Sequence, residues 1–229
     1  MLAWIAHFMR ICPFLGALTA LTVAAHGNSA TAAGFISLSG ITFSEATDNF
    51  RLLAASGTGS LDDPFILVEE VFGDGEVVVG INIQSEDFGS RIKTMHAVGF
   101  ALQKVVINRT EQAWNYYALE LEFKSGQGSD YYDGLSFAQK SQANRPFRSD
   151  SFAMVEDLTE PRDVIRFTRG RVTPGQKARF VVAITHTGNQ PNFFLVQHVR
   201  PPYAELQRSV QLAECAVFMG PKGKTQCRR

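Results

Sequence analysis

The sequence predicts an all-β fold, an antiparallel β-sandwich of the immunoglobulin-like or jelly-roll type. Apolar and polar residues alternate along several short segments, and turn-forming Gly, Pro, Asn and Asp residues separate these segments at short intervals. Only one stretch, residues 203–214, has a helical pattern. About seven or more short strands with this spacing favour an antiparallel sandwich over a parallel α/β sheet.

The clearest strand signals are residues 76–84 and 117–123, in which every second residue is apolar. This alternation is typical of a strand that buries one face. In residues 98–107 the apolar positions change parity, and we explain this change by a β-bulge near Gln103 and Lys104. Additional strands are expected at residues 35–43, 65–72, 163–168, 178–185 and 192–199.

The first residues of the chain have the pattern of a secretory signal peptide. Arg10 precedes an apolar run, residues 11–25, and Ala30-Thr31-Ala32 matches the small-residue cleavage pattern. Because this run is shorter than the roughly 20 residues that span a bilayer, we expect cleavage near Ala33 and no transmembrane span in the mature chain. An uncleaved anchor is the alternative. The protein is therefore expected to be secreted or periplasmic.

The chain divides into three expected segments: the signal peptide at residues 1–32, one β-sandwich domain at residues 33–200, and a C-terminal segment at residues 201–229. The middle segment is long enough for one substantial hydrophobic core. The whole chain balances 22 Lys and Arg residues against 22 Asp and Glu residues. Because nucleic-acid binders concentrate positive charge on one face, we exclude nucleic acid as a partner.

The C-terminal segment is expected to form a short helix followed by a basic tail that a disulfide bond closes. Removal of the signal peptide leaves Cys215 and Cys227 as the cysteines of the exported chain, and thiols pair in oxidising compartments. A turn signal at residues 220–223 lies between them, so we predict that they are bonded. The basic residues of this tail could attach to an anionic envelope polymer or lipid headgroup, or could simply be solvated: Lys222, Lys224, Arg228 and Arg229.

The sequence contains none of the common catalytic or nucleotide-binding motifs, since G-x-S-x-G, H-E-x-x-H and the phosphate-binding loop are absent. We expect the strands that carry His186 and His198 to form a hairpin in which these residues are roughly 16 Å apart. No metal site and no cofactor are therefore predicted. The alternative is a hydrolase that uses paired carboxylates. Its candidate residues are Glu120, Glu122, Asp130 and Asp133.

The most distinctive block of the sequence is residues 107–137, which contain most of the tyrosines and one tryptophan. One hypothesis is an exposed aromatic platform, because the apolar faces of sugar rings stack on aromatic rings. In the alternative, Trp114 fills the core and the tyrosines brace the following loop. Asp130 and Asp133 are also weak candidates for a Ca²⁺ ion. The platform residues are Trp114, Tyr116, Tyr131 and Tyr132, with Asp133 as a polar contact.

Two further motifs belong to the same part of the chain. Asn108-Arg109-Thr110 precedes Trp114 and an aromatic-acidic strand, and the sequence DGLSF follows at residues 133–137. Thr173-Pro174-Gly175-Gln176 precedes another apolar strand. Over residues 98–197 this pattern resembles a β-sandwich module of secreted bacterial proteins. The resemblance implies the same fold and no particular activity.

These observations predict an exported, non-catalytic β-sandwich protein that binds a glycan or another protein at the bacterial envelope. A secreted polysaccharide or ester hydrolase with paired carboxylates is one alternative. A structural envelope component is another, and it would associate through a flat surface or an edge strand. The sequence does not predict the oligomeric state.

Overall fold

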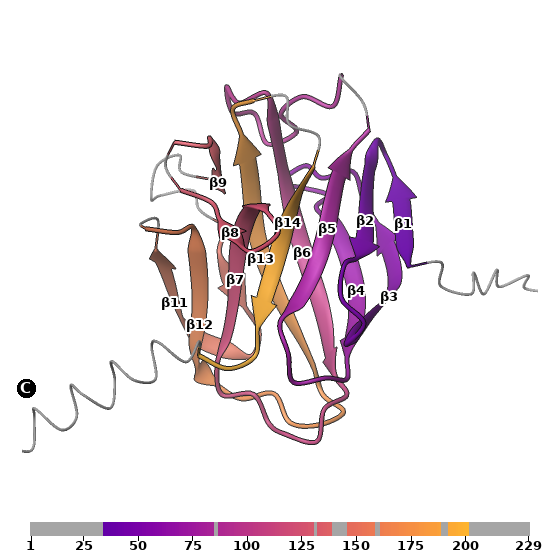
Figure 1. Cartoon of the computed structure of the whole chain (residues 1–229), viewed down its shortest axis with the longest axis vertical. Helices are drawn as coiled ribbons and strands as arrows, with labels where there is room; N and C mark the ends of the chain where they lie inside the picture. The colour runs from indigo at the N-terminus through magenta and orange to yellow at the C-terminus, as the bar shows by residue number, and fades with distance from the viewer. Residues whose placement is uncertain are drawn as a thin grey trace, which may run out of the picture. The chain divides into compact units, whose positions relative to one another are not determined.

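The computed structural model describes residues 34–84, 87–130, 132–138, 146–158, 161–188 and 192–201. Within these ranges the chain forms fourteen strands and no helix. The strands build two sheets that pack against each other (Figure 1). The expected all-β fold with two packed, mostly antiparallel sheets is therefore confirmed. The expected signal peptide, Tyr131, the C-terminal helix and both tail cysteines lie outside the described residues.

The first sheet has the strand order β1-β2-β5-β14-β7-β12-β11, and β8 also pairs with β7. All of these pairings are antiparallel. The strands are β1 (Phe35–Leu38), β2 (Ile41–Glu45), β5 (Val77–Ile83), β14 (Asn192–His198), β7 (Tyr117–Lys124), β12 (Val164–Gly170), β11 (Phe152–Leu158) and β8 (Gln127–Gly128).

The second sheet has the order β10-β13-β6-β4-β3, and β9 also pairs with β13. Its strands are antiparallel except for β4 and β6, which run parallel. Because β13 and β14 belong to different sheets, the expected hairpin between His186 and His198 is wrong. The strands are β10 (Arg148–Ser149), β13 (Lys177–His186), β6 (Val98–Asn108), β4 (Phe65–Val71), β3 (Phe50–Ser56) and β9 (Leu135–Phe137).

The segment expected to form one strand at residues 35–43 forms two. Leu38 pairs with Ile41, so the turn between them consists of Ser39 and Gly40. Both turn residues have positive φ, 48° and 79°. Positive φ at both central residues is typical of the tight turns that match the twist of a β-hairpin. A Ser-Gly pair that we took as part of a strand is therefore the turn.

The bulge expected near Gln103 and Lys104 is absent, because β6 pairs with β13 without interruption from Val98 to Ile107. Alternate residues of β6 are fully buried, and Lys104 is one of them. The apolar pattern changes parity because a lysine occupies a position that faces the interior. Register shifts occur instead between β3 and β4 and between β7 and β8.

Aromatic side chains fill much of the space between the sheets. The rings of Tyr117 and Phe180 come from opposite sheets and stack with centroids 3.9 Å apart. Each buried phenylalanine side chain contributes about 1.5–3 kcal/mol through removal of apolar surface from water. The described chain contains no helix of the length and apolar character needed to cross a membrane.

Candidate functional site

The loop that follows β8 is held by the side chains of its own aspartates. Asp133 Oδ1 accepts hydrogen bonds from Ser129 Oγ and from the Leu135 backbone N–H, both at 2.9 Å. Asp133 Oδ2 accepts from the Asp130 N–H at 3.2 Å, and Asp130 Oδ1 accepts from the Tyr132 N–H at 2.8 Å. Short aspartate side chains commonly order turns in this way. These four hydrogen bonds tie the described residues of the loop to one another.

Gly134 joins this loop to the end of β13. Its φ is 75°, and a Cβ at this position would lie 1.9 Å from Thr187 Oγ1. The Thr187 N–H donates to the Gly134 carbonyl oxygen at 2.9 Å. Only glycine combines this backbone conformation with so close an approach. The position of Thr187 beside the loop is thus fixed by backbone geometry.

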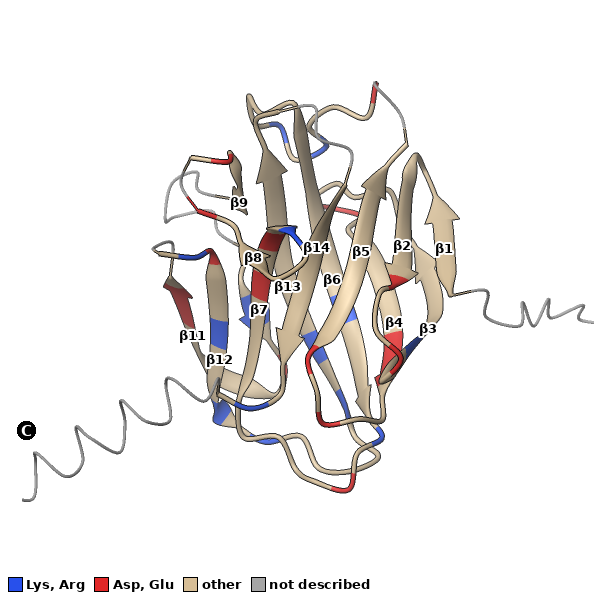
Figure 2. Ribbon diagram, in the orientation of Figure 1, with Lys and Arg blue, Asp and Glu red and all other residues tan. Residues whose placement is uncertain are grey.

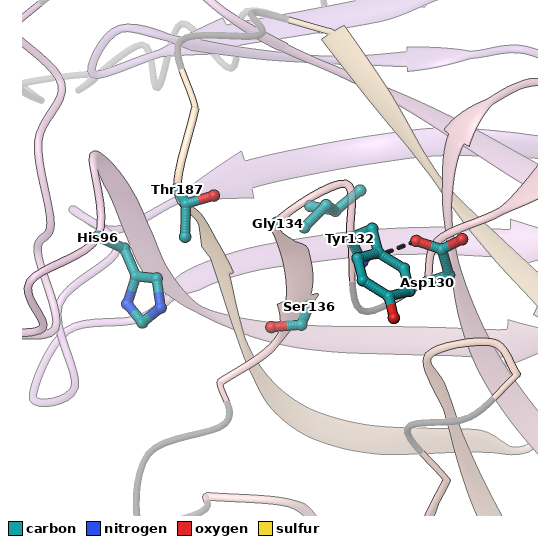
Figure 3. A pocket seen from close by; sticks show the side chains of 7 residues that line it. His96, Asp130, Tyr132, Gly134, Ser136 and Thr187 are labelled. Carbon is teal, nitrogen blue, oxygen red and sulfur yellow. Dashed lines mark hydrogen bonds between the residues drawn. The ribbon is translucent and has the colours of Figure 1, made fainter.

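A pocket of about 220 Å³ lies against this loop (Figure 3). In the view of Figure 3, Tyr132 and Asp130 lie at one end, His96 at the other, and Ser136 between them. Tyr132 is 92% exposed and lines this pocket. The lining residues are His96, Asp130, Tyr132, Gly134, Leu135, Ser136 and Thr187.

His186 is the last residue of β13 and precedes Thr187 in the chain. It is almost fully buried, and its ring stacks on that of Phe123 with centroids 6.1 Å apart. The backbone N–H of Gly188 donates to His186 Nδ1 at 2.8 Å. Burial lowers the pKa of His186, so the imidazole is neutral at pH 7. A neutral, packed histidine here positions the segment that carries Thr187.

The predicted platform residues do not share one surface. Trp114 is 2% exposed, lies in the hydrophobic core, and has its ring centroid 6.1 Å from that of Tyr117. The alternative in which Trp114 fills the core is therefore the one that the structure shows. Tyr116 is half-buried, whereas Tyr132 and Asp133 belong to the loop beside the pocket.

The Asn108-Arg109-Thr110 motif explains why Trp114 is buried. The Asn108 amide donates to the carbonyl oxygens of Gln112 and Val172, at 2.8 and 3.0 Å. Its Oδ1 accepts from the backbone N–H and the hydroxyl of Thr110, at 2.9 and 2.7 Å. Trp114 Nε1 in turn donates to Thr110 Oγ1 at 3.3 Å. Each polar group of this turn is satisfied internally, which is typical of a structural element.

The carboxylates considered for hydrolysis serve structural contacts in the described chain. Glu120 Oε1 accepts from Arg162 Nη1 at 2.8 Å, and its Oε2 lies 3.1 Å from His198 Nε2. Glu122 Oε2 accepts from the Gly126 N–H at 2.7 Å. These two residues are neighbours on one face of β7 rather than partners across a cleft, and both lie in its acidic stretch in Figure 2. This arrangement gives a paired-carboxylate hydrolase no support.

The environments of the two glutamates move their pKa values in opposite directions. Burial acts to raise the pKa of Glu120, but hydrogen bonds and charges from His198 and Arg162 outweigh it, so the net pKa is lowered. For Glu122 burial is the largest influence, and the pKa is raised. Glu120 is therefore ionised at neutral pH and held by its cationic neighbour.

Of the pocket residues, the sequence analysis proposed Tyr132 and Asp130 and did not propose His96 or Thr187. Gly134, Leu135 and Ser136 belong to the DGLSF motif, which was noted but given no role in a site. His96 and Thr187 come from separate segments, and no local motif marks their convergence with this loop. Among the residues that the structure describes, no three His, Cys, Asp or Glu side chains are placed to hold a metal ion. Asp130 and Asp133 stay no more than weak candidates for a Ca²⁺ ion.

Comparison with models of known protein families and with curated proteins finds no match for this chain. The geometry and chemistry of the pocket are therefore the basis for assigning a function. Two structural features are used to assign the function. One is an exposed aromatic ring on an ordered loop, and the other is a small polar pocket beside it.

Proposed function

We propose that the protein is an exported, non-catalytic β-sandwich protein that binds a glycan through the pocket beside residues 129–136. The observation that carries this proposal is the exposed ring of Tyr132 at the rim of a pocket lined by hydroxyl, carboxylate and imidazole groups. A sugar presents an apolar ring face and several hydroxyl groups. Stacking on Tyr132 would hold the face, and the polar lining would orient the hydroxyls.

The charge of the lining favours a neutral glycan over an acidic one. Asp130 lines the pocket, and the lining in the described structure includes no lysine or arginine. A carboxylate accepts hydrogen bonds from sugar hydroxyls and repels acidic sugars. In Figure 2 acidic and basic positions are interspersed along the described strands and loops.

The size and rigidity of the site also suit a sugar. Pockets for drug-sized ligands enclose about 300–1,000 Å³, and this one, at about 220 Å³, suits a single ring of a longer chain. The aspartate hydrogen bonds and Gly134 order the loop in advance, which lowers the entropic cost of binding. The expected signal peptide supports a ligand outside the cytosol, at the bacterial envelope. A protein partner at the envelope is the alternative ligand.

The experiment is a binding measurement on immobilised neutral and acidic polysaccharides with the purified protein. We expect binding to a neutral polysaccharide, and we expect Tyr132→Ala to weaken it about tenfold or more, which is about 1.4 kcal/mol. Tyr132→Phe keeps the ring and should retain most of the binding. Phe72→Ala is the matched control, because Phe72 is another exposed aromatic residue and does not line this pocket.

The binding data also separate the alternatives. Equal binding by the wild-type protein and Tyr132→Ala would contradict the proposed site. Binding to acidic polysaccharides alone would contradict the proposed preference for neutral sugars. Release of reducing sugar ends from the bound polysaccharide would contradict a non-catalytic role and would favour the hydrolase.

A further inference from the structure

Lys104 and Glu69 form an ion pair in the interior of the sandwich. They lie on β6 and β4, which are adjacent parallel strands, and both side chains are 0% exposed. Lys104 Nζ lies 2.8 Å from Glu69 Oε2. Lysine and glutamate are rarely buried completely, because an ion loses several kcal/mol of hydration on burial. This pair plays no part in the proposed glycan site.

The residues beside Lys104 on the two flanking strands are apolar. Leu67 and Phe180 are the direct neighbours of Lys104 on the strands that flank it. Tyr117 stacks on Phe180 from the opposite sheet. Burial and the charge of Glu69 raise the pKa of Tyr117 well above its ordinary value, which indicates that the carboxylate acts across a poorly solvated interior.

The hydrogen bonds of the pair are incomplete. Glu69 Oε1 is buried and has no hydrogen-bond partner in the described structure. A buried ion pair offsets its desolvation only when its remaining polar atoms are satisfied. An unsatisfied carboxylate oxygen therefore makes the ionic form of this pair costly. A neutral form of the same two side chains would avoid that cost.

We propose that Lys104 and Glu69 condense to an amide bond that joins β6 covalently to β4. A proton passes from the ammonium group to the carboxylate, and the Nζ lone pair then attacks Glu69 Cδ. The Nζ–Cδ bond forms, one Cδ–Oε bond breaks, and the oxygen leaves as water with two protons that Nζ originally carried. No oxidant, reductant or cofactor takes part.

The geometry and the environment both favour this reaction. Lys104 Nζ lies 2.8 Å from Glu69 Oε2, an oxygen bonded to the Cδ atom that the amine would attack. The fold therefore holds the two reacting groups side by side, and such pre-positioning raises their effective concentration. Burial lowers the pKa of Lys104, which increases the share of nucleophilic neutral amine. The product replaces two buried charges with one neutral amide, and the apolar interior excludes the water that would hydrolyse it.

Peptide mapping of the purified full-length protein tests the proposal. The protein is denatured, reduced, alkylated and digested, and the peptides are identified by mass spectrometry. We expect the peptide that contains Glu69 joined to the peptide that contains Lys104, with a mass about 18 Da below their sum because water has left. Recovery of both peptides in unmodified, separate form, with no joined species, would overturn the proposal.

Two substitutions and one control complete the experiment. Lys104→Met and Glu69→Leu each remove one reacting group, so neither should give the joined peptide. Lys177→Met removes an exposed lysine of β13 and should leave the joined peptide unchanged. If the core variants fail to fold, the peptide map of the wild-type protein still shows whether the amide between Lys104 and Glu69 is present. A joined peptide that links Lys104 to a residue other than Glu69 would overturn Glu69 as the partner.

Discussion

An aromatic residue and a turn held by short polar side chains lie at each end of β7, but the aromatic residue is buried at one end and exposed at the other. Before β7, Trp114 and the Asn108 turn are buried and bond to each other through Thr110. After β7, Tyr132 is exposed on a loop that aspartates hold, and a pocket lies beside it. Both ends use short polar side chains to fix a turn. Before β7 the turn packs on the core, and its aromatic residue, Trp114, contributes to stability. After β7 the turn faces outward, and its aromatic residue, Tyr132, is placed where it could contact a ligand.

Trp114→Ala should have the largest effect on stability. Truncation of a buried tryptophan leaves a cavity, so we expect a loss of about 3–5 kcal/mol in the free energy of unfolding. Urea denaturation monitored by circular dichroism measures this loss. A loss below about 1 kcal/mol would contradict the core assignment, because exposed side chains behave in that way.

Asn108→Ala should have the next largest effect. It removes two donors and one acceptor that satisfy buried backbone groups, and we expect a loss of about 1–3 kcal/mol. Urea denaturation measures this loss as well. Glycan binding at the Tyr132 loop, which follows the other end of β7, should be unchanged. Weaker binding by a folded Asn108→Ala protein would show that the two ends are not independent.

Asp133→Ala should affect binding more than stability. The loop loses three hydrogen bonds at a partly exposed position, which we expect to cost about 1 kcal/mol of stability. Because the loop is then no longer ordered in advance, glycan binding should weaken about tenfold or more. Asp133→Asn keeps the Oδ1 acceptor and is the control that should retain most of the binding.

The outer face of β7, between the two ends, should give a smaller, pH-dependent effect. Hydrogen bonds from His198 and Arg162 outweigh burial and lower the pKa of Glu120, so its stabilisation is present above the ordinary value of 4.5 and is lost as pH falls through the folded-state pKa. Glu120→Gln should reduce the fall in urea midpoint between pH 7 and pH 3. An unchanged fall would contradict this assignment.

Strands with one buried face could be located from the sequence, because alternation is a local signal. The strands β5 and β7 were predicted to within a few residues for this reason. The edge strands β3 and β11 were not predicted, since few of their residues are buried and the alternation is weak. The bulge at Lys104 was predicted wrongly because nothing in the local sequence distinguishes a buried lysine from an exposed one.

The candidate site could be predicted only in part. Tyr132 and the aspartates of its loop stand together in the sequence, so their position near a site was accessible. His96 and Thr187 reach the pocket from distant segments, and their convergence depends on sheet topology. Trp114 was a candidate for both core and surface, and only the packing around Tyr117 decides between these positions.

The most direct test of the glycan site is a titration of the isotopically labelled protein with a neutral polysaccharide fragment, followed by amide chemical shifts. We expect the largest shift changes at residues 129–136 and at His96 and Thr187, with little change around Asn108 and Trp114. Changes centred on the Trp114 end of β7, or on an edge strand with none at the Tyr132 loop, would contradict the proposed glycan site.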